Sequence, residues 1–393
     1  MAGRSLRILF LAPQPFFEVR GTPLAVLHMT RALASLGHSV DLLTFPQGEA
    51  IPHEGVRHLR SPRLPVGRVR AGPSLAKMAL DVPFLAEAVW RLRFGGYDVV
   101  HAVEEAAHLI APFASWFGVP LVMDVDSAIP DQLRYSGFAR RGPLLRLAEA
   151  LERYALRHSA TAVTVCASLT EGVRSRAPGL PVFQVEDPPL VEPGTTPPPE
   201  AVEKLRRELT LGPWPVVLYS GNFEPYQGVE LLLEALAHVP QVQLVLMGGR
   251  PDDVARMKAE ARARGIGERT VFSGLRPPSE LPLFLAVADV LVSPRARGEN
   301  TPFKIFTYIA SGKPLVATRI PTHTQLLDDT TAFLVEPTPR ALAAGLQSAL
   351  DRPEDAAARA RAALDLVRRE YSVERYREKI ARAYAEVERI VSR

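Results

Sequence analysis

The segment 293–314 holds the side chains best suited to binding an anion. Its Pro302 precedes a run with helical periodicity, and proline fits the first turn of a helix. The N–H groups of Phe303 and Lys304 would then lack intrahelical acceptors. Lysine is rare, with six among 47 basic residues, and its ammonium is a compact charge suited to phosphate. The segment predicts a phosphate site around Lys304, with a plain surface lysine as the alternative.

Two glycine loops have the chemistry to bind a second phosphate. Gly21 and Thr22 precede Pro23, which predicts a helix with Thr22 as its N-cap. Gly221 and Gly228 lie between another apolar run and another amphipathic one. Free N–H groups at a helix start bind anions, although a purely structural turn is the alternative for the first loop. Neither loop has the dinucleotide spacing G-x-G-x-x-G, which argues against a dehydrogenase.

Parallel strands must position these loops, and the sequence contains two sets of them. Six short apolar runs precede residue 186, and six more follow residue 215. Runs of this length, separated by helix-length segments, are typical of parallel strands covered on both faces. The proline-dense segment 187–199 can form neither a helix nor a central strand. The sequence therefore predicts two doubly wound α/β domains, with ligands bound in the cleft between them.

The predicted boundaries are residues 1–188 for the first domain and 189–371 for the second. Residues 372–393 have the apolar spacing of an amphipathic helix. We expect this helix to pack back on the first domain.

The composition excludes several classes of protein. With 47% hydrophobic and 23% charged residues, the chain is an ordinary globular protein. Its net charge of +4 is spread out, so we expect no nucleic-acid partner. The single cysteine, Cys166, rules out an intramolecular disulfide and a multi-cysteine metal centre. No apolar run approaches the roughly 20 residues of a spanning helix, and no signal peptide is evident. We therefore expect a cytoplasmic protein.

One stretch of the chain is unusually basic. Residues 55–80 contain six cations and no acid, and arginines and aromatic residues follow to position 94. A basic stretch that leads into an aromatic helix can bind an anionic membrane. Residues 55–94 therefore predict a peripheral contact with the inner membrane face. A solvated loop and a helix with arginine at its rim are the alternative.

The segments 221–235 and 310–317, together with the order of elements, resemble family 4 of the retaining glycosyltransferases. The resemblance covers essentially the whole chain and is strongest over 216–335. It implies the GT-B fold of two Rossmann-like domains. It also implies that a sugar nucleotide lies on the C-terminal domain and that the acceptor enters over the N-terminal one.

The family carries two glutamates separated by seven residues, and these positions fall on Glu299 and Thr307. The resemblance assigns the donor-sugar hydroxyls to Glu299. It places Thr307 where a glutamate normally binds ribose. Base recognition in the family usually comes from the backbone of a loop, which here lies around Leu275.

The family's usual arginine and lysine for the diphosphate fall on Asn222 and Gln227, which are uncharged. Two cations are therefore missing where the leaving group gathers negative charge. We expect Lys304 to replace them, with Arg295 or Arg297 behind it.

The acceptor side is assigned by its place after a strand. In many relatives a histidine follows the strand that matches 120–125, and here Asp126 takes that position. A carboxylate can accept the acceptor proton or orient the hydroxyl. His101 is a second candidate, with a structural histidine as its alternative. Asp124 and Asp126 also form D-x-D, the metal signature of the single-domain transferase fold, but the second α/β half contradicts that fold. We therefore expect no metal.

The sequence thus predicts a retaining glycosyltransferase that moves a sugar from a nucleotide-diphosphate donor to a hydroxyl of a glycan, a lipid or a small molecule. The resemblance implies front-face displacement, in which the leaving phosphate helps to deprotonate the acceptor. No cofactor is expected besides the sugar-nucleotide co-substrate. A GT-B sugar-nucleotide epimerase and a catalytically weak nucleotide-binding scaffold are the alternatives. The predicted catalytic residues are Glu299, Asp126 and Lys304. The predicted donor-binding residues are Gly21, Thr22, Gly221, Asn222, Gln227, Gly228, Leu275, Thr301, Pro302, Phe303 and Thr307.

Overall fold

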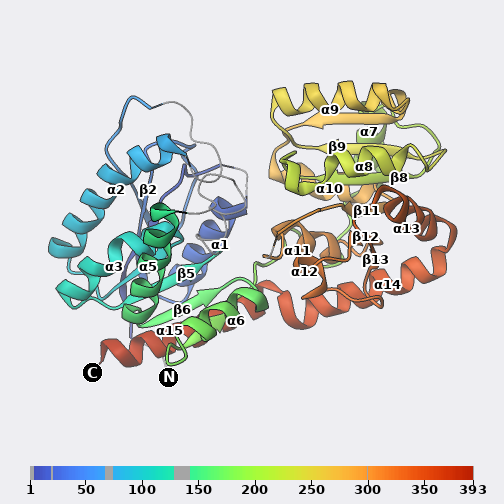
Figure 1. Cartoon of the computed structure of the whole chain (residues 1–393). Helices are drawn as coiled ribbons and strands as arrows, with labels where there is room; N and C mark the ends of the chain where they lie inside the picture. The colour runs from blue at the N-terminus through green and yellow to red at the C-terminus, as the bar shows by residue number, and fades with distance from the viewer. Residues whose placement is uncertain (1–3, 19–20, 67–73, 128–141, 299, 393) are drawn as a thin grey trace. The chain divides into compact units, whose positions relative to one another are not determined.

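The computed structural model describes residues 4–18, 21–66, 74–127, 142–298 and 300–392. The chain divides into two compact units (Figure 1). The first unit comprises Met1–Asp187 with Tyr376–Arg393, and the second comprises Pro188–Arg375. Each unit has its own all-parallel sheet with helices around it, so the predicted fold class of two doubly wound α/β domains is confirmed.

The first unit is built on a seven-stranded sheet in the order β3-β2-β1-β4-β5-β6-β7. Its strands are β1 (Arg7–Ala12), β2 (Ser39–Thr44), β3 (Val56–Arg60), β4 (Val99–Val103), β5 (Leu121–Val125), β6 (Thr161–Thr164) and β7 (Val182–Gln184). Its helices are α1 (Gly21–Ser35), α2 (Leu75–Phe94), α3 (Glu105–Phe117), α5 (Pro143–His158), α6 (Ala167–Arg176) and α15 (Val373–Val391). Every residue of β4 and β5 is buried, because helices cover both faces of the sheet.

Helix α15, drawn in red in Figure 1, belongs to this first unit although it ends the chain. The positions expected to be apolar supply its buried face, with Tyr376, Ile380, Tyr384 and Val387 inside. The Tyr384 hydroxyl lies 2.8 Å from Nδ1 of His101 on β4, so the helix is fixed to the centre of the sheet.

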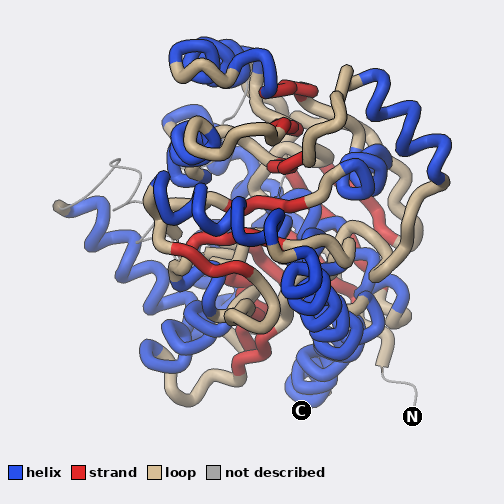
Figure 2. Tube along the Cα trace, turned by 90° about the vertical axis from the view of Figure 1, so that its right-hand side faces the viewer, coloured by secondary structure: helices blue, strands red, loops and turns tan. Residues whose placement is uncertain are grey.

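The second unit has a six-stranded sheet in the order β10-β9-β8-β11-β12-β13. Its strands are β8 (Val216–Ser220), β9 (Gln243–Met247), β10 (Thr270–Gly274), β11 (Val290–Ser293), β12 (Leu315–Thr318) and β13 (Phe333–Val335). Its α-helices are α7 (Pro199–Glu208), α8 (Val229–Leu236), α9 (Pro251–Ala263), α10 (Leu281–Val287), α11 (Phe303–Ala310), α12 (Pro321–Thr324), α13 (Pro339–Asp351) and α14 (Pro353–Leu366). Short helical turns are η1 (Pro225–Gln227), η2 (Gly267–Arg269), η3 (Pro278–Glu280) and η4 (Val367–Tyr371). Figure 2 shows the strands, in red, enclosed by helices, in blue.

The alternative of a solvated loop does not hold for Val56–Arg60, which form the edge strand β3, where Arg57 pairs with the buried Asp41 of β2. One local expectation is wrong. Helix α1 begins at Gly21, so Thr22 lies in its first turn instead of forming its N-cap. Pro23 still fits, because the first turn of a helix needs no proline N–H.

Among the described helices, none combines the length and the apolar character that spanning a bilayer requires.

Candidate active site

The loops after β8 and β11 pack against each other in the second unit. Gly228 has φ 74°, and a Cβ atom there would overlap the carbonyl oxygen of Pro294. The N–H of Ala296 donates to the carbonyl of Tyr226 at 3.0 Å. Only glycine permits this approach. The structure therefore joins two segments that the sequence indicated separately.

Lys304 points into this junction. Its Nζ lies 3.2 Å from Oε1 of Gln227 and 3.9 Å from the ring centroid of Tyr219. A Cβ atom at Gly221 would come within 2.8 Å of the same Nζ. In the part of the chain that the structure describes, no carboxylate pairs with Lys304. Burial, and then the charge of Arg295, hold the pKa of Lys304 well below its usual value.

Arg295 is the second buried cation of the site. Its Nε and Nη1 donate to the carbonyls of Arg297 and Asn300 at 2.9 and 3.2 Å, and Nη2 donates to Oδ1 of Asn300 at 3.1 Å. Burial lowers the pKa of Arg295. Arg297, the other arginine expected here, is exposed and contributes only its carbonyl. Two cations thus lie together with neutral acceptors, and an anion would compensate both charges.

The start of α11 differs slightly from the expectation. Pro302 is the N-cap of the helix, with φ −67° and ψ 133°, and is not part of its first turn. Phe303 and Lys304 are therefore the first two helical residues, and their N–H groups have no acceptor within the helix. Thr301 is buried just before the cap. The helix thus presents its N-terminus beside the Lys304 ammonium.

The other described residues expected to contact the donor have other contacts or lie exposed in the structure. Oγ1 of Thr307 accepts a hydrogen bond from the N–H of Leu190 at 3.1 Å, and the residue is buried. This use of the hydroxyl differs from the expected ribose contact. Asn222 closes its own loop, with Oδ1 accepting from the N–H of Glu224 at 3.2 Å. Leu275 is 68% exposed. Glu299 lies outside the described residues.

Three buried side chains that the sequence did not indicate hold these loops. The Tyr308 hydroxyl accepts from the N–H of Ser220 at 2.6 Å, which ties α11 to the end of β8. The Tyr219 hydroxyl donates to the carbonyl of Asn222 at 2.6 Å. His323 contacts Oγ of Ser293 at 2.9 Å. For the two tyrosines, the sequence offered one signal, a tyrosine inside an apolar run, because a buried tyrosine needs a partner for its hydroxyl.

In the first unit, Asp126 directly follows β5 and is half-buried. Burial, and then the charges of Asp124 and Glu104, raise the pKa of Asp126 well above its usual value. A carboxylate with a raised pKa is a better base near neutral pH. The position therefore suits proton transfer.

His101 is not available to an acceptor. Its ring is fully buried on β4, stacked on Phe10 with 4.4 Å between centroids. Its Nε2 lies 3.1 Å from Oδ2 of Asp124. Of the two interpretations of His101 that the sequence left open, this geometry supports the structural one. Asp124 is engaged by the same contact, and the described residues contain no group of three or more metal-ligating side chains.

Helix α1 begins with Gly21 and Thr22, and the described structure does not require glycine at position 21. A Cβ atom at Gly21 would meet nothing within 4 Å. The preceding residues 19–20 lie outside the described part of the chain, so the proposed anion contact there stays a prediction.

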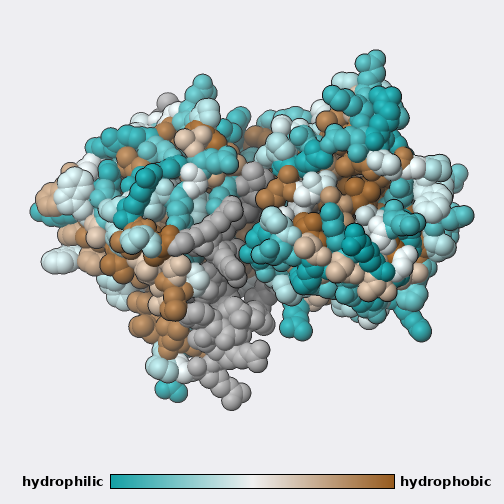
Figure 3. Space-filling model, turned by 90° about the horizontal axis from the view of Figure 1, so that it is seen from above, coloured by the Kyte–Doolittle hydropathy of each residue, from teal (hydrophilic) through white to brown (hydrophobic). Residues whose placement is uncertain are grey.

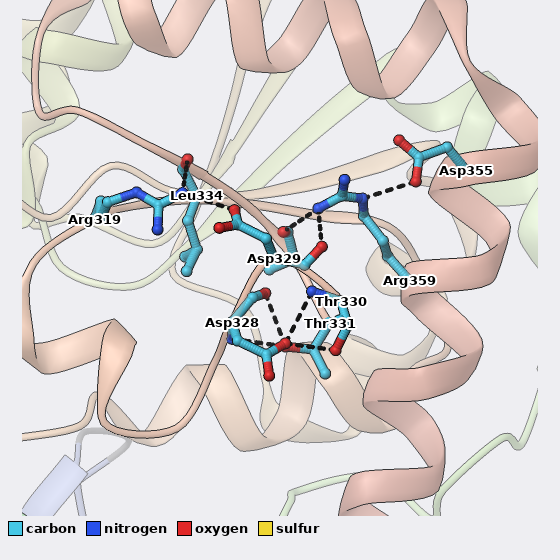
Figure 4. Close-up of polar contacts among 9 residues, drawn as sticks. Arg319, Asp328, Asp329, Thr330, Thr331, Leu334, Asp355 and Arg359 are labelled. Atoms are coloured by element: carbon cyan, nitrogen blue, oxygen red, sulfur yellow. Dashed lines mark hydrogen bonds and ion pairs between the residues drawn. The ribbon is translucent and has the colours of Figure 1, made fainter.

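A separate cavity of about 380 Å³ lies beside β13, α13 and α14. Arg359, which lines it, already donates to Asp355 at 2.9 Å and to the carbonyl of Ala332 at 2.8 Å (Figure 4). Arg319 binds Asp329 at 2.7 Å in the same view. Because Arg359 and Arg319 have partners here, these contacts fix the loop before β13, and we assign no ligand to the cavity.

Comparison with known families gives matches in both units. Residues 202–365 match the family described as Glycosyl transferases group 1. Residues 20–178 match the family described as Glycosyl transferase 4-like domain. Together the two matches cover about four fifths of the chain.

Individual relatives agree with these matches. A GDP-mannose-dependent alpha-(1-6)-phosphatidylinositol monomannoside mannosyltransferase of Mycolicibacterium smegmatis is 33% identical over 135 residues, which span 31% of this chain and 35% of that enzyme. The glycogen synthase of Mycobacterium tuberculosis is 27% identical over 91% of this chain and 89% of that enzyme.

Solved structures show the same fold. Sucrose-phosphate synthase from Thermosynechococcus elongatus has a TM-score of 0.80 at 21% identity, covering 98% of this chain and 99% of that one. HepE of Anabaena in complex with UDP-glucose has a TM-score of 0.78 at 19% identity, covering 97% and 99%. The expected GT-B architecture is confirmed.

Proposed function

The chain belongs to the glycosyl transferases whose family models match its two units, and from that premise we propose that it is a retaining, metal-independent hexosyltransferase. The donor is a nucleotide-diphosphate hexose bound on the second unit. The acceptor is a hydroxyl bound on the first unit beside Asp126.

The observation that carries the proposal is the pair of buried cations, Lys304 and Arg295, which contact only neutral acceptors in the described part of the chain. A diphosphate would replace those weak partners with charge-assisted contacts. Lys304 takes over the role of the positive charges absent from Asn222 and Gln227. Gln227 orients the ammonium, because its Oε1 accepts from Nζ at 3.2 Å.

In the transfer step the bond between the anomeric carbon and the phosphate oxygen breaks, and a bond from that carbon to the acceptor oxygen forms. The acceptor proton passes to the leaving phosphate on the same face of the sugar, with Asp126 orienting the hydroxyl or holding the proton. Negative charge develops on the phosphate, where the α11 N-terminus and Lys304 stabilise it. Retention follows from attack on the face that the leaving group occupied.

A donor panel tests this proposal. The purified chain is incubated with UDP-glucose, GDP-mannose and ADP-glucose, with and without sugar and lipid acceptors, in EDTA. We expect one donor to give a product whose anomeric proton in NMR keeps the donor configuration. Inversion, or a requirement for added divalent metal, would contradict the proposed mechanism. A new epimer formed without acceptor would favour the epimerase, and a thermal shift unaffected by any nucleotide would favour a scaffold.

We further propose that α2 contacts an anionic membrane, which would give access to a lipid-linked acceptor. One face of this helix is apolar yet exposed, with exposed fractions of 76% for Leu75, 70% for Val82, 58% for Trp90 and 67% for Phe94. These positions recur at helical spacing and so form one stripe. Trp116 of α3, 79% exposed, lies close to its end, since Arg93 contacts Phe117. Figure 3 shows hydrophobic side chains gathered on the surface of the first unit.

The charges beside the stripe complement an anionic surface. The exposed guanidinium of Arg93 lies 5.1 Å from the ring centroid of Phe94. Arg91 lies 5.9 Å from the Trp90 ring, but it pairs with Glu87 at 2.6 Å. Basic residues next to exposed aromatic rings are typical of an interfacial helix. The alternative of a solvated helix does not explain why the outer residues are apolar.

Sedimentation with phosphatidylglycerol vesicles tests the contact. We expect the double variant Val82→Glu with Trp90→Glu to lose binding, because charges would enter the apolar layer. Trp214→Glu is the matched control, since Trp214 is 41% exposed on the second unit. Equal binding by both variants would exclude α2 as the contact surface.

A further inference from the structure

Glu104 has a backbone conformation that side chains rarely adopt. It follows β4 and caps α3 with φ 50° and ψ −127°. In the described part of the chain, the other non-glycine residues with positive φ are Thr210 and Gln241. Glycine would adopt this conformation without strain. A glutamate held there indicates that its side chain has a use.

The contacts of Glu104 reach the segment that carries the candidate base. Its N–H donates to the carbonyl of Asp124 at 3.0 Å. Its carboxylate accepts a hydrogen bond from Oγ of Ser127 at 3.0 Å. Asp126 lies between those two residues. The ends of β4 and β5 are therefore joined by two hydrogen bonds. The backbone bond lies on the N-terminal side of Asp126, and the side-chain bond lies on its C-terminal side.

We infer that Glu104 is a positioning residue for Asp126, fixing the turn after β5 and setting the charge around its carboxyl group. The inference rests on the proposed role of Asp126 in transfer. The bent backbone lets the Glu104 carboxylate turn back toward Ser127, whose hydroxyl donates to it at 3.0 Å. Removing the side chain would leave the turn without that contact.

The surroundings of the two carboxyl groups are mostly acidic. Burial, offset in part by the charge of Lys77, raises the pKa of Glu104. Glu104 in turn contributes to the raised pKa of Asp126. The other titratable groups around the pair are Asp124 on β5, Cys166 before α6, Asp187 after β7, Lys77 on α2, Glu105 on α3 and Tyr376 on α15. Each of the two carboxyl groups therefore makes ionisation of the other less favourable.

A double-mutant cycle tests the electrostatic part without any substrate. The free energy of unfolding is measured at pH 8 for Glu104→Gln, Asp126→Asn and the double variant. Glutamine keeps the acceptor for Ser127. Each single change removes one of two carboxyl groups that make each other's ionisation less favourable, so we expect the double variant to gain less than the sum of the single gains. Additive effects would overturn the inference.

The positioning part is tested by Glu104→Gly, with Gln241→Gly as the control for relief of backbone strain. Both variants should fold at least as stably as wild type. We expect Glu104→Gly to lose at least about tenfold in kcat with donor affinity unchanged, and Gln241→Gly to keep both. For Glu104→Gln, the acidic limb of kcat/KM should move to lower pH, because a neighbouring negative charge no longer raises the pKa of Asp126. A wild-type chain with no transfer would refute the proposed function, whereas Glu104→Gly with normal kcat would refute only this inference.

Discussion

Replacement of Lys304 by methionine tests the charge that the donor site depends on. Methionine keeps the apolar stem and removes the ammonium, which contacts Gln227 and the Tyr219 ring. A donor aimed at a developing oxyanion contributes about 2.7–4 kcal/mol, which corresponds to a fall of roughly 10²–10³ in kcat. Affinity for the nucleotide diphosphate should fall less, because Arg295 and the α11 N-terminus remain. Stability should be unchanged or higher, since a buried charge is removed.

The same variant should change the pH dependence of binding. Lys304 has a lowered pKa in the free protein because of burial and Arg295, and a bound diphosphate would raise that pKa. A group whose pKa rises on binding takes up a proton. Affinity for the diphosphate is therefore highest below the pKa that Lys304 has in the free protein. It falls as the pH rises from that value toward the pKa of Lys304 in the complex. Titration calorimetry in two buffers of different ionisation heat should detect this uptake in wild type and not in Lys304→Met.

Lys313→Met is the matched control for this experiment. Lys313 is half-buried after the same helix, and its Nζ donates to the carbonyl of Ala286 at 3.0 Å. Burial lowers its pKa too, but among the described residues no hydrogen bond or ion pair links it to the glycine loop. We expect normal turnover in this variant. If Lys304→Met keeps kcat within about threefold of wild type, or if both variants lose equally, the charge is not supplied by Lys304.

Two further predictions concern Asp126 and Tyr308. Asp126→Asn should abolish transfer in a product assay while leaving nucleotide affinity intact. A raised acid pKa means that stability is lost as pH rises from the unfolded to the folded value, so this variant should be at least as stable as wild type at pH 8 in urea unfolding. Tyr308→Phe would leave the buried N–H of Ser220 without its acceptor, costing about 1–3 kcal/mol in the same assay. An unchanged midpoint for Tyr308→Phe would show that water or another group replaces the hydroxyl.

Most strands could be predicted from apolar runs. Twelve of the 13 strands correspond to such runs in the sequence, because a parallel strand covered on both faces has few polar positions. The exception, β3, is an edge strand with the sequence VRHLR and no fully buried residue. Its stability comes from pairing with β2 and from the contact of Arg57 with Asp41. A local pattern cannot contain that information, because the partner lies 16 residues away.

In the site, too, some residues could be predicted from the local sequence, whereas the roles of others depend on partners far away in the chain. The glycine loop and Lys304 were indicated by residue type. The loop follows the end of β8 and Lys304 lies in the first turn of α11, after β11, and doubly wound sheets bind their ligands beyond the strand ends. The role of Thr307 depends instead on Leu190, which is 117 residues away in sequence and uses the hydroxyl as an acceptor. His101 looked catalytic by position, but Tyr384, 283 residues away, encloses it with Phe10. A polar residue at a strand end is thus available to a ligand only if no distant segment has already satisfied it. Thr307 and His101 are held by such segments, so the proposed reaction rests on Lys304, whose ammonium lies against the neutral Oε1 of Gln227, and on Asp126 after the end of β5.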